Sequence, residues 1–310
     1  MRNTTPVIVG AGLAGLLAAH AWPGASLVEA AARPTEVHKA VLRFRTRNVA
    51  NLVGIEFRAV RVHKGIWQST KFVEPNIRSA NLYAQKVLGA GALRGDRSIW
   101  NLAPVERFIA PDTLYAQLLD SVGHRVRWGE EADFAALALD EPVVSTAPLP
   151  IALASLDIET KEQFRRAPIT VRRWRIPGAD VFQTVYFPTP EHAMYRASIT
   201  GDMLIAEFSS ADAESPMDAA MDDIKCAFGV NITALEFLGV STQRYGKIDP
   251  ISDTVRKSLL FQLTHKHNVF SLGRFATWRN ILLDDVVDDI TVIKRLLRAS
   301  SEYELRKAAS

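Results

Sequence analysis

The sequence predicts an α/β protein in which a Rossmann-like nucleotide-binding domain carries an inserted, mainly antiparallel β domain. Residues 7–29 have the pattern of a strand, a glycine turn, a helix and a second strand. Residues 168–210 alternate with the period of two that is typical of strands, and residues 268–297 return to strand, glycine and helix. Because the two α/β stretches lie near opposite ends of the chain, the nucleotide-binding domain is expected to be discontinuous. We place it at 1–40, 95–160 and 245–310, and the inserted domain at 41–94 and 161–244.

The first unit holds a G-x-G-x-x-G motif between the apolar residues 7–9 and an alanine- and leucine-rich run, which is the context that the motif requires. Gly10 permits the tight turn out of the strand, and Gly12, without a Cβ atom, lets the backbone approach a pyrophosphate. Gly15 lets the helix pack against the sheet, and the helix N-terminus offers free N–H groups to phosphates. Glu29, at the tip of the second strand, can accept hydrogen bonds from ribose hydroxyls. The unit therefore predicts a dinucleotide site.

A secretory signal peptide is the competing interpretation of these residues, because Arg2 precedes the apolar stretch 7–22. The glycines and alanines at 10–15 fit a nucleotide turn better than a signal core. We also find no clean small-residue cleavage site ahead of a mature chain. The nucleotide turn is the interpretation that we retain.

The composition is that of a globular protein, with 48% hydrophobic and 23% charged residues and no stretch of roughly 20 apolar residues that could span a membrane. The single cysteine, Cys226, excludes a disulfide framework and any cysteine-based metal cluster, and its apolar neighbours predict a buried thiol. We expect no metal and a cytoplasmic location, in the host cytoplasm if the chain is phage-encoded. The formal net charge of +3 permits an anionic partner without requiring one.

A basic segment follows the first unit, with nine histidines, lysines and arginines between positions 38 and 64. Arg43, Arg45 and Arg47 alternate with other residues, which on a strand would place all three side chains on one face. One interpretation is an ordinary solvated strand face. The other is an anion-binding strip for cofactor phosphates, a phosphorylated substrate or a nucleic-acid backbone. The sequence leaves both open.

The remaining elements are predicted from period and turn signals. Glycines at 89, 91 and 95 indicate a loop over a site. We expect helices at 111–123 and 216–229, a short strand at 125–128, a buried strand at 142–148 beside the first strand, antiparallel strands at 170–176, 181–187 and 203–208, and a further strand at 255–263.

The C-terminal stretch is the second informative one. A strand at 268–272 leads into Gly273 and Arg274, aromatic residues follow, and an acid-led helix runs from Asp284 to about Leu297. Gly273 allows close backbone approach, Arg274 can reach a phosphate, and the helix points N–H groups at a ligand. The alternative is a strand and an amphipathic helix that only pack the edge of the sheet. Together with residues 7–29, the pattern favours a second nucleotide-contacting turn.

The two ends together resemble the FAD-binding flavoproteins of the amine-oxidase and UDP-galactopyranose-mutase group, over roughly residues 5–33, 142–150 and 268–297. The resemblance implies a GR2-type FAD-binding domain, with 41–94 and 161–244 as the substrate-binding domain. Two features depart from the group: the Gly-Gly that usually follows the acidic residue is replaced here by residues 33–36, and the chain is short. The residues expected at FAD are Gly10, Gly12, Leu13, Ala14, Gly15, Glu29, Ala30, Arg33, Thr146, Gly273, Arg274, Asp284, Asp285 and Val286.

The resemblance implies an FAD-dependent oxidoreductase of amine-oxidase type, which oxidises a C–N bond by hydride transfer to the flavin. A narrower hypothesis, by analogy with small bacteriophage FAD proteins, is oxidative cleavage of glycine-modified thymine in phage DNA to an aminomethyl base. Alternatives are a mutase-like flavoenzyme on a nucleotide sugar, a small-amine oxidase, and a non-catalytic NAD- or FAD-binding protein. No catalytic base can be named; the candidate catalytic residues are His38, Lys39, His63 and Trp67.

Overall fold

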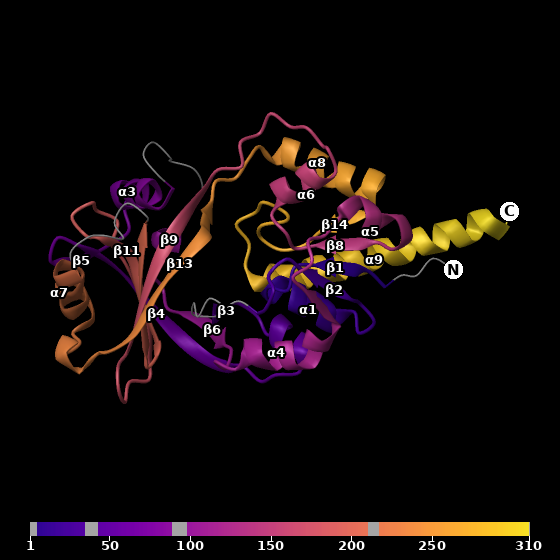
Figure 1. Ribbon diagram of the computed structural model, residues 1–310. Helices are drawn as coiled ribbons and strands as arrows, with labels where there is room; N and C mark the ends of the chain where they lie inside the picture. Colours follow the sequence, from indigo (N-terminus) through magenta and orange to yellow (C-terminus); the bar gives the residue numbers. More distant parts are fainter. Residues whose placement is uncertain (1–4, 35–42, 89–97, 210–216, 310) are drawn as a thin grey trace.

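The computed structural model describes residues 5–34, 43–88, 98–209 and 217–309 and contains two β-sheets side by side (Figure 1). A five-stranded parallel sheet lies at one end and a nine-stranded, mainly antiparallel sheet at the other. This arrangement agrees with the α/β class that the sequence predicts.

The parallel sheet has the strand order β14-β8-β1-β2-β7. Its strands are β1 (Val7–Val9), β2 (Leu27–Glu29), β7 (Val126–Trp128), β8 (Val143–Ser145) and β14 (Val269–Ser271). The chain proceeds from β1 to one side through β2 and β7, and then to the other side through β8 and β14. The order therefore reverses between β1 and β8, and such a switch point opens a crevice at the carboxyl ends of the strands.

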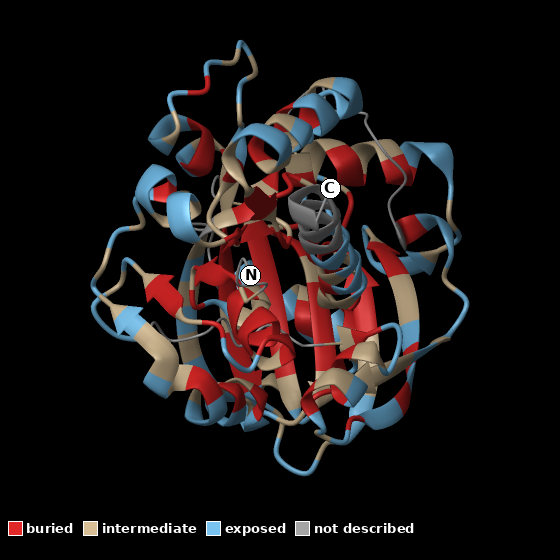
Figure 2. Ribbon diagram, turned by 90° about the vertical axis from the view of Figure 1, so that its right-hand side faces the viewer, coloured by how far each residue is buried: buried red, intermediate tan, exposed pale blue. Residues whose placement is uncertain are grey.

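Helices cover both faces of the parallel sheet and form three layers with it. One face carries α1 (Leu13–Ala21), α2 (Asn48–Val53), α4 (Leu114–Val122) and α9 (Leu283–Ala309), and the other carries α5 (Phe134–Asp140), α6 (Leu149–Ser155) and α8 (Asp253–His267). Ile8, Val144 and Phe270 pack on the α1 side. Their neighbours in the same strands, Val9, Val143 and Val269, pack on the α8 side. Both faces are apolar because both are buried, so these short strands show no polar alternation (Figure 2).

The larger sheet has the order β13-β9-β12-β11-β10-β4-β6-β3, with β5 paired to β4. Its strands are β3 (Arg43–Phe44), β4 (Arg58–Gln68), β5 (Lys71–Val73), β6 (Val105–Ile109), β9 (Arg166–Arg175), β10 (Val181–Tyr186), β11 (Met194–Gly201), β12 (Met203–Ser209) and β13 (Glu236–Ile248). Neighbouring strands are antiparallel except β10 and β4, which are parallel. The strand β11 lies between the strands predicted at 181–187 and 203–208. The strand β12 then pairs with β9, so β9 is a neighbour of β12 and not of β10.

Two helices cover parts of this sheet from opposite sides. The helix α7 (Met217–Phe228) packs on one apolar face, and α3 (Ile77–Leu88) packs on the other, which also faces the parallel sheet. Three short 3-10 turns, η1 (Ser98–Trp100), η2 (Gly123–Arg125) and η3 (Ile232–Ala234), complete the described elements.

Three expectations from the sequence are wrong. Residues 255–263 form part of the helix α8 and not a strand: Asp253 in its first turn pairs with Lys257 at 2.7 Å, and Arg256, Leu259 and Leu263 are buried at helical spacing. Cys226 is exposed, because the buried face of α7 carries Ala220, Ile224 and Ala227 instead. The strand β6 belongs to the larger sheet, although the boundary at 95 places it with the nucleotide-binding part. The glycine segment at 89–95 lies outside the described residues.

Candidate functional site

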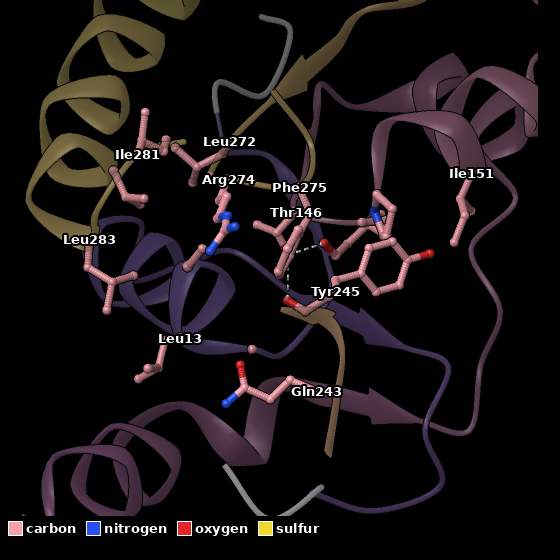
Figure 3. A pocket seen from close by; sticks show the side chains of 18 of the residues that line it. Leu13, Thr146, Ile151, Gln243, Tyr245, Leu272, Arg274, Phe275, Ile281 and Leu283 are labelled. Atoms are coloured by element: carbon pink, nitrogen blue, oxygen red, sulfur yellow. Dashed lines mark hydrogen bonds between the residues drawn. The ribbon is translucent and has the colours of Figure 1, made fainter. Parts of the chain in front are cut away.

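A cavity of about 1220 Å³ opens where the carboxyl ends of the five parallel strands face the larger sheet. The residues after β1, β2, β7, β8 and β14 all contribute to its wall, which is the position that the reversal of strand order predicts for a ligand. Figure 3 shows Leu13, Ile281 and Leu283 on one side of this space, Ile151 on the opposite side, and Tyr245 and Gln243 of β13 facing them. A cavity of this size exceeds the roughly 300–1,000 Å³ of ordinary ligand pockets, so it can hold a large cofactor together with a substrate.

The three glycines of the first turn have different surroundings. Gly10 has φ +100°, and a Cβ on it would lie 2.3 Å from Thr146 Oγ1. A Cβ on Gly15 would lie 1.9 Å from the carbonyl oxygen of Gly10, so this glycine is required for the helix to meet the strand. Gly12 lines the cavity and has no atom within 4 Å of the place where its Cβ would stand. The turn is therefore closed on the protein side and open towards the cavity.

The start of α1 is directed at this open space. Gly12 is its N-cap residue, and no side chain caps the first turn. Leu13 and Ala14, the next two residues, also line the cavity. Uncapped backbone N–H groups at a helix N-terminus favour an anionic group.

Glu29 holds the end of β2 against the first turn. Its carboxylate accepts hydrogen bonds from the backbone N–H of Ala11 at 2.7 Å and of Ala31 at 2.9 Å, and it lines the cavity. Thr146, after β8, fixes the same turn from the other side by donating its hydroxyl to the carbonyl oxygen of Val9 at 2.8 Å. Both residues lie where the sequence predicts cofactor contacts, as does Ala30.

The second turn packs directly on the first. Gly273 has φ +87°, and a Cβ on it would lie 3.0 Å from the Cβ of Ala14. Arg274 lines the cavity, and its Nη2 donates to the carbonyl oxygen of Gly246 on β13 at 3.2 Å. Arg274 therefore connects the second turn to the larger sheet.

The acidic start of α9 has a role that the sequence does not reveal. The carboxylate of Asp284 is buried and accepts hydrogen bonds from the backbone N–H of Arg45 at 3.1 Å and of Thr46 at 3.0 Å. Asp285 pairs with Arg45 at 2.5 Å. Asp284 and Val286 line the cavity, whereas Asp285 lies outside its wall, as do Gly15 and the exposed Arg33. The two aspartates thus anchor the segment at 45–46 to the helix α9, which packs on the parallel sheet.

Arg43, Arg45 and Arg47 do not lie together on one strand face, contrary to the placement that their alternation in the sequence indicates. Within the described residues the strand β3 contains only Arg43 and Phe44, and the three arginines have separate surroundings. Arg45 pairs with Asp285, and Arg47 lies over the ring of Phe108 with 4.8 Å between the guanidinium carbon and the ring centroid. Arg43 alone lines the cavity.

A charged cluster lies on the cavity wall at the larger sheet. Arg196 on β11 forms an ion pair with its cross-strand neighbour Glu207 on β12, and the hydroxyl of Tyr195 donates to the same carboxylate at 3.0 Å. The register of β11 shifts between Met194 and Arg196, so two consecutive residues turn to the same side of the sheet. Burial would raise the pKa of Glu207, yet Arg196, aided by Lys247 and Tyr195, outweighs burial and lowers the pKa of this carboxyl to about 2.

A second irregularity brings β13 into the cavity. The register against β9 shifts between Gln243 and Lys247, and Gln243, Tyr245, Gly246 and Lys247 all line the space. A Cβ on Gly246 would lie 2.4 Å from the side chain of Ile169, so glycine is needed for this close approach. None of the lining residues of β11, β12 and β13 was predicted as a site residue from the sequence. The one available signal was Gly246 inside a strand pattern, which indicates a bulge.

The two described catalytic candidates, His63 and Trp67, do not line this cavity. His63 lines a separate cavity of about 560 Å³ together with Ala227 and Phe228 of α7, on the face of the sheet away from the larger cavity. Trp67 is buried against the α7 side, where its ring meets Phe72 edge-on. His38 and Lys39 lie outside the described residues. Within the described part of the chain we find no cluster of possible metal ligands, and no helix there has the length and apolar character to cross a membrane.

The structure is similar to several solved enzymes. It matches reduced UDP-galactopyranose mutase with a TM-score of 0.65 at 14% identity, over 96% of this chain and 95% of the mutase chain. A CLA-producing fatty acid isomerase from P. acnes matches with a TM-score of 0.57 at 11% identity, over 95% and 99% of the two chains. A ternary complex of aklavinone-11 hydroxylase with FAD and aklavinone matches with a TM-score of 0.51 at 13% identity, over 97% of this chain and 63% of the hydroxylase.

No protein-family model and no curated protein sequence matches this chain. At identities of 11–14% the structural likeness establishes the fold, and it confirms the predicted fold class.

Proposed function

We propose that this protein binds FAD in the larger cavity and is an FAD-dependent oxidoreductase. The observation that carries the proposal is the open space at Gly12, between the uncapped N-terminus of α1 and the second turn. A tight glycine turn that is closed by its own chain on one side and empty on the other suits a pyrophosphate. The fold shared with aklavinone-11 hydroxylase, which is described in complex with FAD, supports the same cofactor.

The residues present fit the parts of this cofactor. Gly12, Leu13 and Ala14 would meet the pyrophosphate with backbone N–H groups, and Glu29 would accept hydrogen bonds from the ribose of the adenosine half. Gly273 and Arg274 would border the pyrophosphate and the flavin half. In this arrangement the adenosine end of FAD would lie at the parallel sheet, and its flavin end would lie on the side of the cavity that faces β13.

Bound FAD supplies a two-electron acceptor that can take hydride from a carbon next to an amine nitrogen. The side chains of the cavity position the substrate and keep water away from the reacting carbon. Phe275 and Tyr245, with rings 5.3 Å apart, and Leu272 form an apolar part of the wall that can serve this purpose. We assign no side-chain base, because an amine substrate can arrive already deprotonated.

A mutase-like reaction on a nucleotide sugar is the second candidate, and the observation in its favour is the likeness to reduced UDP-galactopyranose mutase over nearly the whole of both chains. The narrower hypothesis of glycine-modified thymine in phage DNA came from an analogy, and it loses the support of a basic strip because Arg43, Arg45 and Arg47 do not form one basic face. It stays a prediction that modified DNA would test directly.

An absorbance spectrum of the purified protein, taken with and without added FAD, tests the cofactor. We expect flavin bands that remain after gel filtration. Anaerobic addition of a panel of primary and secondary amines, and of DNA carrying glycine-modified thymine, then tests the reaction: bleaching by one of these without another reductant supports an amine oxidase. Turnover of a nucleotide sugar only after reduction with dithionite would support the mutase instead. A protein that retains no flavin would refute the proposal.

A further inference from the structure

The charges on the cavity wall are separated along its length. Four acids on the wall belong to the part built on the parallel sheet: Glu29 at the end of β2, Glu130 and Glu131 after β7, and Asp284 at the start of α9. The cations Arg43, Arg166, Arg196 and Lys247 lie on strands of the larger sheet, where Glu207 is the one acid on the described wall, and a further cation, Arg274, lies on the second turn. The two ends of the cavity therefore present opposite electrostatic potentials to a ligand.

The cation Arg43 has no acidic partner. Its guanidinium donates only to neutral oxygens: to the hydroxyls of Thr184 and Thr200, both at 2.5 Å, and to the carbonyl oxygens of Ile199 at 2.8 Å and Gln183 at 3.2 Å. Among the described residues no carboxylate lies within ion-pair distance of it. Burial and the repulsion of the neighbouring Arg196 lower the pKa of Arg43 to about 10. Two guanidiniums thus face one carboxylate, Glu207, which is already paired with Arg196.

Lys247 adds a third positive charge at the same place. Its ammonium nitrogen lies 4.7 Å above the ring of Tyr195, and its charge contributes to the low pKa of Glu207. With Glu207 ionised, the four groups carry a formal charge of +2 on the wall of a cavity. Cations held partly out of water are stabilised by an anion placed between them.

We infer that this end of the cavity, built by Arg43, Arg196 and Lys247, binds the anionic group of the substrate, a carboxylate or a phosphate. The inference rests on the proposed function, since that function assigns the opposite end of the cavity to the adenosine half of FAD. The hydrogen-bonding groups of Arg43 are already engaged with neutral oxygens, so Arg43 acts through its charge. Lys247, whose ammonium can rotate, is the group that contacts the anion.

Two simple ligands test the subsite, benzoate for a carboxylate and phenyl phosphate for a phosphate, with benzamide as the neutral control. Binding is measured as the rise in unfolding temperature of the protein, with and without FAD, and as the perturbation of the flavin spectrum in the FAD-loaded protein. We expect one of the two anions to bind and benzamide not to bind. Which anion binds more tightly identifies the class of the substrate group.

Lys247→Met removes the charge and keeps the length of the side chain, and we expect it to weaken anion binding at least tenfold, which corresponds to about 1.4 kcal/mol. Lys247→Arg should restore most of the affinity. The matched control is Lys257→Met on α8, whose side chain is 69% exposed and does not line the cavity. We expect the control to bind like the wild type.

Several outcomes would overturn the inference: no binding of either anion by wild-type protein, equal binding of benzamide, or equal losses in the Lys247→Met and Lys257→Met variants. Failure of the proposed function has a different signature. In that case the protein retains no flavin, while the anion still raises the unfolding temperature of the FAD-free protein in a Lys247-dependent manner.

Discussion

The substitution Gly12→Ala separates the role of the first turn in the fold from its role in cofactor binding. Gly12 has φ −72° and ψ 178°, which alanine adopts freely, and nothing lies within 4 Å of its missing Cβ. Alanine is a poorer N-cap residue than glycine, but it also lowers the entropy of the unfolded chain, and each effect is worth about 1 kcal/mol or less. The two effects oppose each other. We therefore expect the unfolding temperature without FAD to change by less than about 3 °C.

FAD binding should respond very differently. The new methyl group stands in the space through which a pyrophosphate would reach the N–H groups of α1. Moving the phosphates away from these donors should weaken FAD binding at least 30-fold, or about 2 kcal/mol. A titration of FAD-free protein, followed by flavin fluorescence and absorbance, gives the dissociation constants of the variant and the wild type.

Gly15→Ala is the matched comparison in the same turn. Its methyl group would lie 1.9 Å from the carbonyl oxygen of Gly10, so strand and helix must move apart. We expect it to lower the unfolding temperature by more than 5 °C as well as to weaken FAD binding. Wild-type FAD affinity in Gly12→Ala would refute the assignment of the first turn. An equal loss of stability in the two variants would refute the distinction drawn from their surroundings.

Three further predictions concern single side chains. Glu29→Ala should weaken FAD binding about tenfold in the same titration, because two backbone amides and the ribose lose their acceptor; an unchanged affinity would contradict this. The folded-state pKa of Glu207 is lowered from 4.5 to about 2, so its ion pair stabilises the fold above pH 4.5 and loses this contribution as the pH falls towards 2. Urea unfolding of Glu207→Gln should therefore show a deficit on the order of 3 kcal/mol at pH 7 that shrinks by pH 3, and a deficit independent of pH would contradict this. Trp278→Phe should lower the free energy of unfolding by about 1–3 kcal/mol, since the fully buried indole donates to the carbonyl oxygen of Asp249 at 2.9 Å. Trp100→Phe, at a 43% exposed position, should change this free energy little. Equal losses in the two variants, measured by urea unfolding, would contradict the role of that hydrogen bond.

Much of the part built on the parallel sheet could be predicted from the sequence, because its signals are local. The glycine turn at 10–15, the acid at the tip of β2 and the glycine after β14 each act over a few residues, and each lies at the cavity. A turn that requires φ above zero or an absent Cβ restricts the residue type directly. The position of the strand β8 beside β1 could also be predicted, because in a doubly wound sheet such a strand returns the chain beside the first one.

The wall at the larger sheet could not be predicted in this way. Arg196 and Glu207 are ordinary residues of two strands, and only the register of β11 against β12 makes them a pair. Tyr195 reaches the same carboxylate because the strand register shifts beside it, and no period in the sequence marks this shift. The alternation of arginines with other residues from Arg43 to Arg47 indicated one strand face. The strand β3 ends after Phe44, however, and Asp284 and Asp285 of α9 bind the following residue, Arg45.

The sequence by itself therefore determined the α/β class, the first glycine turn and its partner near the C-terminus, because backbone geometry limits which residues such turns accept. Tertiary structure alone decided which charges face the cavity. That choice depends on pairings between strands far apart in the chain, on shifts of register within them, and on how the two sheets face each other across about 1220 Å³ of space.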